Sequence, residues 1–263
     1  MKLNLTFVTM LLFLSQLAQS QEPYKEYYDD GSLKAIGQFL NGSKSGEWTY
    51  YNPYGEIKEK GAYQNGKKTG PWISYYLDDK IMSAGSFQNG KEIGEWKYYH
   101  ANGKLAKVMV YQNGIKSGPL RYYDFDGNLK TVGTYQNDVP IGEWMSYHEN
   151  GEISERGMYQ GGKRSGEWKE FYDNGNISKE GIYQKGEKHG EWRTYAKTRG
   201  ELVGTGSYNN GKKIGTWKLF YRSGPLMREG EYVNDKAEGV WTIYNENGSV
   251  KEIKNYKNGK LQN

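Results

Sequence analysis

Residues 61–72 read GAYQNGKKTGPW, and they contain the signals for one complete hairpin. At its centre stands Asn65-Gly66, a pair typical of a two-residue type I′ turn, in which both central residues need positive φ. Tyr63 precedes the turn, and Trp72 follows it with Gly70 two positions earlier. The stretch therefore predicts a tight β-hairpin that carries aromatic side chains on both strands.

The same pattern returns every 24 residues along the chain, with one residue inserted before Trp217. A fixed period of this length is typical of stacked repeat architectures. Tyr24 and Leu120 replace tryptophan in two of the units, and the eight tryptophans are expected to form a structural ladder. The units begin near Tyr24, Trp48, Trp72, Trp96, Leu120, Trp144, Trp168, Trp192, Trp217 and Trp241.

Each unit also has a second aromatic residue three positions after the tryptophan, as Tyr51 follows Trp48, and then a second turn with glycine. One hairpin cannot bury its apolar side, but stacked hairpins can, with like rings of successive units lying over one another. In a flat strand Trp48 and Tyr51 have opposite parity, so either a bulge separates them or the two rows face opposite sides. We expect an all-β, elongated single-sheet solenoid of about ten stacked 24-residue β-hairpins over residues 21–263, with essentially no helix after residue 22.

The two end units differ from the others. The first has Tyr24 in place of tryptophan, and the last has Lys254 in place of glycine and a polar stretch over residues 258–263. Polar ends keep an open stack of strands soluble, so the sequence predicts capping units at both ends.

The composition narrows the class of protein. Leu, Ile, Val and Phe together number 45 of 263 residues, against 25 tyrosines and 36 glycines, which disfavours a large α/β core or a helical bundle. The chain has no cysteine, and this excludes disulfides, thiolate metal sites and cysteine nucleophiles. A net charge of +5 is nearly balanced for this length and gives no strong attraction to nucleic acid.

The N-terminal segment has the pattern of a secretory signal. A mostly apolar run from Leu3 to Leu17 is followed by Ala18-Gln19-Ser20, with small residues at the −3 and −1 positions of a cleavage site. We expect residues 1–20 to be a signal peptide that is cleaved near Ser20, and the protein to be exported to the periplasm, the cell envelope or the extracellular space. The alternative is an uncleaved anchor, although the run is short for a membrane span.

The repeated Gly-x-Tyr-x-Asn-Gly-Lys-x-x-Gly-x-Trp motif, seen at residues 61–72 and 206–217, resembles the MORN repeat. The 24-residue period and the Tyr-Tyr-x-x-Asn-Gly that follows resemble the bacterial variant of the YwqK-type antitoxin family. The resemblance covers residues 24–263. It implies a β-hairpin solenoid that binds other molecules and has no catalytic activity of its own.

Two sets of side chains are candidates for a binding surface. Basic pairs follow the Asn-Gly turns and could bind a lipid or another polyanion. Glutamates stand just before the tryptophans, so the basic pairs are also typical of a solvated surface on which both charges alternate. The extra tyrosines suit sugars or extended peptides, or else ordinary cross-strand packing. The basic candidates are Lys67, Lys68, Lys163, Arg164, Lys212 and Lys213. The aromatic candidates are Tyr28, Tyr50, Tyr76, Tyr98, Tyr122, Tyr172 and Tyr221.

Motifs for catalysis are missing from the sequence, which has no Gly-x-Ser-x-Gly, no P-loop and no His-Glu-x-x-His. His100 and His148 are two units apart, too far to share a metal, and His189 is expected in a turn. We expect no enzyme activity, cofactor, metal or catalytic residue, and no nucleic-acid partner.

Three functions remain open. The first is an exported binding or scaffold protein with a protein partner, the second an antitoxin or immunity protein that masks a toxin, and the third a module that binds cell-surface glycans. Membrane binding is disfavoured, because export separates the protein from the inositol lipids of a cytoplasmic leaflet.

Overall fold

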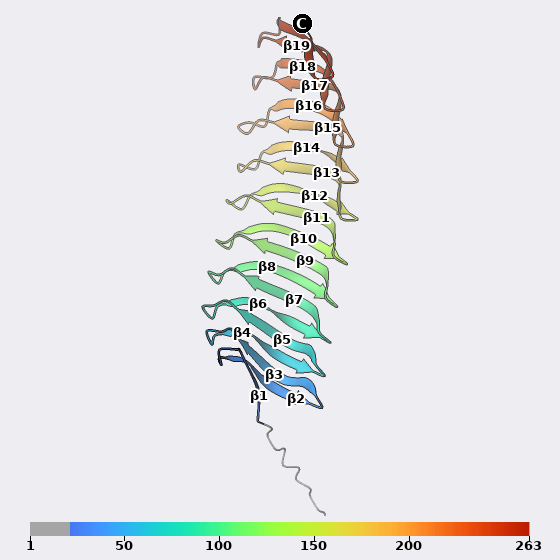
Figure 1. Ribbon diagram of the computed structural model, residues 1–263. Helices are drawn as coiled ribbons and strands as arrows, with labels where there is room; N and C mark the ends of the chain where they lie inside the picture. Colours follow the sequence, from blue (N-terminus) through green and yellow to red (C-terminus); the bar gives the residue numbers. More distant parts are fainter. Residues whose placement is uncertain (1–21, 263) are drawn as a thin grey trace, which may run out of the picture.

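The computed structural model describes residues 22–262. The expected signal segment 1–20 and its cleavage near Ser20 lie outside the described residues. Within the described range all regular structure is β-strand, and no helix is present that could cross a membrane. The strands form a single antiparallel sheet in which each strand pairs with the next one along the chain. Figure 1 shows the resulting elongated, twisted stack of hairpins, and it confirms the expected single-sheet solenoid.

The strands alternate between two lengths. The longer kind has nine residues and carries the tryptophan position: β3 (Ser43–Tyr51), β5 (Lys67–Tyr75), β7 (Lys91–Tyr99), β9 (Ile115–Tyr123), β11 (Val139–Tyr147), β13 (Lys163–Phe171), β15 (Glu187–Tyr195), β17 (Lys212–Phe220) and β19 (Lys236–Tyr244). The shorter kind has eight residues: β2 (Leu33–Leu40), β4 (Ile57–Gln64), β6 (Ile81–Gln88), β8 (Leu105–Gln112), β10 (Leu129–Gln136), β12 (Ile153–Gln160), β14 (Ile177–Gln184), β16 (Leu202–Asn209), β18 (Leu226–Val233) and β20 (Val250–Lys257). Two short strands flank them: β1 (Tyr24–Tyr27) and β21 (Lys260–Gln262).

Two kinds of turn join the strands. The short turn has two residues, and in Asn65-Gly66 both have positive φ, 51° and 77°, as a type I′ turn requires. The long turn has five residues, or six after β15, and in the turn after β3 the Gly55 amide donates to the Asn52 carbonyl at 3.0 Å. The turns expected from the Asn-Gly pairs are therefore confirmed.

Each tryptophan ring lies flat against a glycine of the preceding strand. A Cβ atom added to Gly157 would lie only 2.2 Å from the Trp168 ring, far inside van der Waals contact. Trp168 is 2% exposed, and its indole N–H donates to the Met158 carbonyl at 3.2 Å. The same contact is made by Gly37, Gly61, Gly85, Gly133, Gly157, Gly181, Gly206 and Gly230. The glycine of each unit is therefore required because the indole occupies the space of a side chain.

The sequence predicted that tryptophans of successive units lie directly on one another, and this prediction is wrong. An aromatic ring from the intervening short strand stands edge-on between them: Tyr159 contacts Trp168 at 5.4 Å and 83°, and Trp168 contacts Tyr183 at 5.7 Å and 74°. Edge-to-face contact is favoured because it sets the positive ring edge against the negative ring face. The core is therefore a row of alternating rings rather than a stack of indoles.

One unit replaces this contact with a different pair. Leu120 takes the tryptophan position, and Met109 takes the place of the glycine opposite it. Both side chains are buried, with 9% and 2% exposure. A smaller residue at the ring position thus leaves room for a larger one beneath it, and the volume of the core is kept.

The two aromatic rows of each unit lie on opposite faces of the sheet. Tyr183 of β14 contacts Trp192, whereas Glu180 of the same strand accepts a hydrogen bond from the Tyr195 hydroxyl at 2.6 Å. Glu180 and Tyr183 are three residues apart, so their side chains leave opposite faces. Bulges are also present, and one leaves Gly70 and Pro71 without partners in β4. A second register shift lies between Ser74 and Tyr75 in the pairing of β5 with β6, so irregularities flank Trp72 on both sides.

We predict that Gly157→Ala destabilises the protein by about 1–3 kcal/mol, because the added methyl group must displace the Trp168 ring. Urea unfolding followed by tryptophan fluorescence measures the effect. The matched control is Ser86→Ala, at a strand position whose side chain faces away from the ring row. Equal unfolding midpoints for the two variants would contradict the prediction.

Candidate functional site

The sheet has two different faces. The tryptophan face carries the ring row, and cations cover it. The opposite face, which we call the charged face, carries Arg156, Lys169, Glu180 and Arg193 directly opposite one another on successive strands. It also carries the second aromatic row, and Arg156 lies 5.6 Å from the centre of the Phe171 ring.

The six basic candidates divide between two environments. Lys68 lies 3.7 Å from the Trp72 ring centre and pairs with Glu59 at 2.9 Å, and Arg164 lies 4.1 Å from Trp168. Lys213 lies over Trp217 in the same way, whereas Lys67, Lys163 and Lys212 begin their strands and are exposed. Cation–π contact accounts for the first three, so the six residues do not form one basic stripe.

Four of the seven candidate tyrosines belong to the long turns. The hydroxyl of Tyr28 donates to the Tyr51 carbonyl at 2.8 Å, and that of Tyr76 to the Tyr99 carbonyl at 2.7 Å. Each bond joins one repeat to the next, and Tyr172 and Tyr221 repeat it with the carbonyls of Tyr195 and Tyr244.

Two of the three histidines stand at the same turn position as these tyrosines. The Nε2 atoms of His100 and His148 lie 3.1 and 2.9 Å from the carbonyls of Tyr123 and Phe171. His189 lies within β15 rather than in the expected turn. Within residues 22–262 no group of His, Asp and Glu side chains is placed to hold a metal ion.

The other three candidate tyrosines lie two positions after the tryptophan or its replacement, on the tryptophan face. The Tyr50 ring stacks with Trp48 at 5.9 Å, and its hydroxyl donates to that of Tyr63 at 3.0 Å. Tyr98 shares a hydroxyl contact of 3.2 Å with Tyr111, and Tyr122 is 46% exposed. Burial, together with this hydrogen bond, raises the pKa of Tyr98 above its ordinary value.

The structure brings Tyr28 and Tyr76 into one depression at the long-turn edge. Leu77 and Met82 stand beside them with 65% and 40% exposure, although large apolar side chains are usually buried. The lining residues of this apolar depression are Tyr28, Asn52, Pro53, Ile57, Lys58, Tyr75, Tyr76, Leu77 and Met82.

Sequence reasoning missed the aliphatic part of the depression. The available signal was the third unit, where Asp79 replaces the turn glycine and apolar residues stand on both sides of it.

A model for the MORN repeat variant matches residues 23–41, 68–89, 92–113, 116–137, 140–160, 164–185, 213–234 and 237–258, which together make up more than half of the chain. The protein belongs to this MORN repeat family. No curated protein matches the chain.

Solved structures resemble this MORN protein only distantly. The GtfA/B complex bound to UDP and GlcNAc shares 12% identity over 41% of this chain and 21% of that one, with a TM-score of 0.18. A mutant of S. aureus TarM in complex with Fondaparinux, alpha-GlcNAc-glycerol and UDP shares 12% identity over 46% of this chain and 19% of that one, with a TM-score of 0.19. The Photorhabdus luminescens Tc holotoxin pore shares 11% identity over 89% of this chain and 15% of that one, also with a TM-score of 0.19. The chain thus spans about a fifth or less of each, and these likenesses carry no argument about function.

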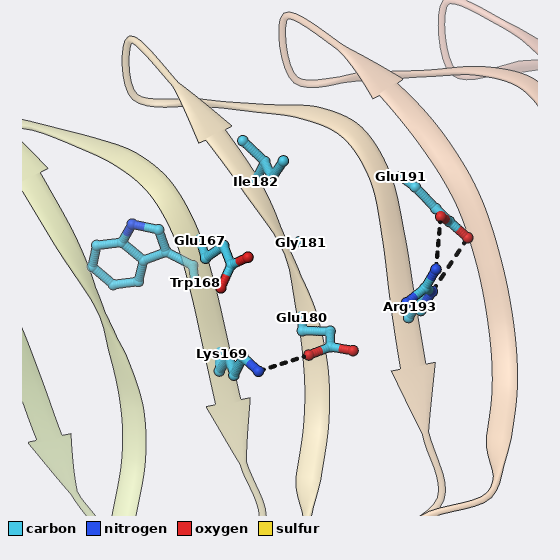
Figure 2. Close-up of a pocket in the computed structure, with 8 residues that line it drawn as sticks. All are labelled: Glu167, Trp168, Lys169, Glu180, Gly181, Ile182, Glu191 and Arg193. Atoms are coloured by element: carbon cyan, nitrogen blue, oxygen red, sulfur yellow. Dashed lines mark hydrogen bonds and ion pairs between the residues drawn. The ribbon is translucent and has the colours of Figure 1, made fainter.

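A second depression of the MORN sheet lies on the charged face, and Figure 2 shows its lining. Lys169 pairs with Glu180 at 3.2 Å, and Arg193 pairs with Glu191 at 3.0 Å, while the Trp168 indole points away toward the other face. Exposed pairs of this kind contribute little to stability. Four of its five charged side chains, all but Glu167, are paired within the lining, so this depression is a weaker candidate for binding than the apolar one.

We predict that Tyr76→Phe lowers the free energy of unfolding by about 0.5–1.5 kcal/mol, since it removes the bond to the Tyr99 carbonyl in the next repeat. The matched control is Tyr75→Phe, because the hydroxyl of Tyr75, the neighbour of Tyr76, makes no comparable bond among the described residues. Urea unfolding of both variants provides the measurement. A larger loss for Tyr75→Phe would refute the assigned role.

A second prediction concerns alkaline pH. The pKa of Tyr98 is higher in the folded protein than its ordinary value of about 10, so the neutral hydroxyl stabilises the fold below that pH. This contribution is lost as the pH rises through the folded-state pKa. Urea unfolding at increasing pH should therefore show a steeper loss of stability for the wild type than for Tyr98→Phe. Tyr54→Phe, at a residue that is 83% exposed, should follow the wild type.

Proposed function

We propose that the protein is an exported, non-enzymatic binding or scaffold protein that recognises a protein partner through the surface of its repeat array. MORN repeats commonly serve as binding modules, and this chain consists largely of them. The observation that carries the proposal is the apolar depression around Tyr28, Tyr76, Leu77 and Met82. Its exposed side chains offer an anchor point of the kind that dominates protein interfaces.

The depression is preorganised for binding. The hydroxyls of Tyr28 and Tyr76 are held by carbonyls of the next repeat, so the two rings are fixed before a partner arrives. A fixed ring loses little conformational entropy on binding, and this lowers the cost of forming a complex. Leu77 and Met82 add flexible apolar contact beside the fixed rings.

Export and lack of catalysis are part of the same proposal. The segment 1–20 supports export through its apolar run and small residues before the expected cleavage position. The absence of catalytic motifs in the sequence supports a function by binding alone. A processed N-terminus at Gln21 in the protein recovered from the envelope or medium would support export, and a retained segment in the cytoplasmic fraction would oppose it.

Glycan binding is the second candidate function. The ring faces of Tyr28 and Tyr76 line the apolar depression, and aromatic faces are suited to stacking against sugars. The hydroxyls of Tyr28 and Tyr76 are occupied, which leaves Tyr75, Asn52 and Lys58 to supply the polar groups of the lining. A glycan array would support this function only if a substitution in the depression removes the signal.

An antitoxin or immunity function is a narrower form of the same proposal. Its support is the sequence resemblance to the YwqK-type antitoxins, and the partner would then be a toxin that acts outside the cytoplasm. Co-expression with the product of a neighbouring toxin gene, followed by growth, tests it: growth that stays inhibited would remove this form while leaving partner binding open.

We predict that Leu77→Asp combined with Met82→Asp abolishes partner capture without unfolding the protein, because both side chains are already partly exposed. Pull-down from envelope and culture fractions, with wild type and variant compared side by side, measures the effect. Val240→Asp is the control, since Val240 is 59% exposed but lies far along the chain from the depression. A partner retained equally by all three proteins would show that the depression is not its site.

A further inference from the structure

The short turns and the long turns lie at opposite edges of the sheet, and the two edges differ in charge (Figure 1). Within residues 22–262, the short turns, taken with the strand residue on each side, contain eight lysines and three acidic residues. The long turns contain twelve acidic residues and five basic ones. Charges of opposite sign are thus separated between the two edges, although the net charge of the whole chain is small.

Lysines are densest at the five consecutive short turns that begin with the turn between β12 and β13. A Cβ atom added to Gly186 would lie 3.5 Å from the Cβ of Lys163, and one added to Gly259 would lie 3.7 Å from that of Lys236. The turns therefore stack directly, and because two strands separate consecutive turns, their lysines recur about every 10 Å. Six exposed lysines of these turns form what we call the basic edge: Lys163, Lys185, Lys212, Lys236, Lys257 and Lys260.

The lysines of the basic edge differ from the other cations of the protein in having no partner among the described residues. Lys68 and Lys213 cover tryptophan rings, and Lys179 pairs with Glu170 at 3.0 Å. Within residues 22–262, no ion pair and no cation–π contact includes a lysine of the basic edge. Their charges are therefore available to an external anion.

The glutamates that precede the tryptophans do not neutralise this edge, although the sequence allowed that interpretation. Glu167 and Glu191 line the depression of the charged face, and Glu191 pairs there with Arg193 at 3.0 Å. The acidic residues of the five turns themselves are Glu187 and Asp235. The Asp235 carboxylate accepts a hydrogen bond from the Lys213 amide at 2.9 Å, so it also serves its own turn.

We propose that the basic edge binds a flexible, linear anionic polysaccharide whose negative groups contact successive lysines. One small anion cannot bridge side chains whose strands are spaced about 10 Å apart, whereas a chain with repeated charges can contact several of them at once. A row of unneutralised cations also raises the local concentration of such a chain. This site is separate from the apolar depression, which lies among the long turns.

The shape of the edge favours a flexible chain over a membrane. Adjacent strands of a sheet are rotated by about 20° relative to one another, so the turns at one edge follow a winding line. Figure 1 shows this twist along the stack. A flat bilayer would meet only some of the five turns at a time, whereas a flexible polymer can follow all of them.

The surroundings of the edge favour a polysaccharide over a nucleic acid. Proteins that bind single strands combine basic grooves with aromatic rings on which the bases stack. The rings nearest this edge are already covered, since Arg164 lies 4.1 Å from the centre of the Trp168 ring and Lys188 lies 4.0 Å from that of Trp192. Recognition here therefore depends on charge alone, which an anionic polysaccharide satisfies.

Binding of polygalacturonate to the full chain tests the proposal, with its methyl-esterified form as the uncharged probe. The edge variant combines Lys163→Gln, Lys185→Gln, Lys212→Gln and Lys236→Gln. The control variant combines Lys97→Gln, Lys104→Gln, Lys197→Gln and Lys218→Gln, which are equally exposed but lie on the charged face or at the long turns. Titration calorimetry at low salt should show binding by wild type and control, and affinity at least about tenfold lower for the edge variant, because most of the charged row is lost.

A footprint locates the site without any substitution. Acetylation of the wild type by an amine-reactive reagent, followed by mass spectrometry, should be slowed by polygalacturonate at the basic edge and not at Lys104 or Lys218. The proposal is overturned by a wild type that does not bind, by equal loss in both variants, by equal binding of the methyl-esterified polymer, or by protection that is uniform along the chain. Tighter binding of single-stranded DNA, or of vesicles that contain phosphatidylglycerol, would overturn the choice of a polysaccharide.

Discussion

The contact between an indole ring and a bare glycine backbone makes it possible for this protein to fold as a single sheet. A single sheet has no second layer to cover it, so its apolar side chains must be sheltered by neighbours in the same sheet. Here the ring lies across the adjacent strand and fills the volume that a side chain would take. The ring of the next short strand then closes the row edge-on. The rings are thus buried within one layer, and neither face of the sheet needs a second layer to cover it.

Much of this architecture could be predicted from residue types and spacing. Asn65-Gly66 indicates its own turn conformation, and the 24-residue recurrence of tryptophan indicates stacking. The arrangement of rings could not be predicted, because edge-on insertion of Tyr159 between Trp144 and Trp168 depends on side-chain directions across three strands. The three-residue spacing of the two aromatic rows allowed either a bulge between them or rows on opposite faces, and residue types alone could not choose between these arrangements.

The candidate surfaces were harder to predict for a related reason. Lys68 and Lys67 are neighbours in sequence, yet one covers Trp72 and the other is exposed at the turn, since adjacent strand residues point to opposite sides. Tyr28 and Tyr76 are 48 positions apart and meet at one depression, because the long turns lie along the same edge of the sheet. Residue type identified the candidates, and only the stacking of turns decided which of them share a site.

The pair of Met109 and Leu120 has a consequence for how such a chain changes in evolution. Among residues 22–262, strand pairs and hydrogen bonds join each repeat only to its neighbours, so gain or loss of a whole 24-residue segment leaves the remaining interfaces intact. That freedom does not extend to a crossover between positions 109 and 120. It would set methionine beneath an incoming indole, or glycine beneath leucine, and leave either a collision or a void. Genetic recombination within this gene should therefore tolerate breakpoints almost anywhere except inside that short interval.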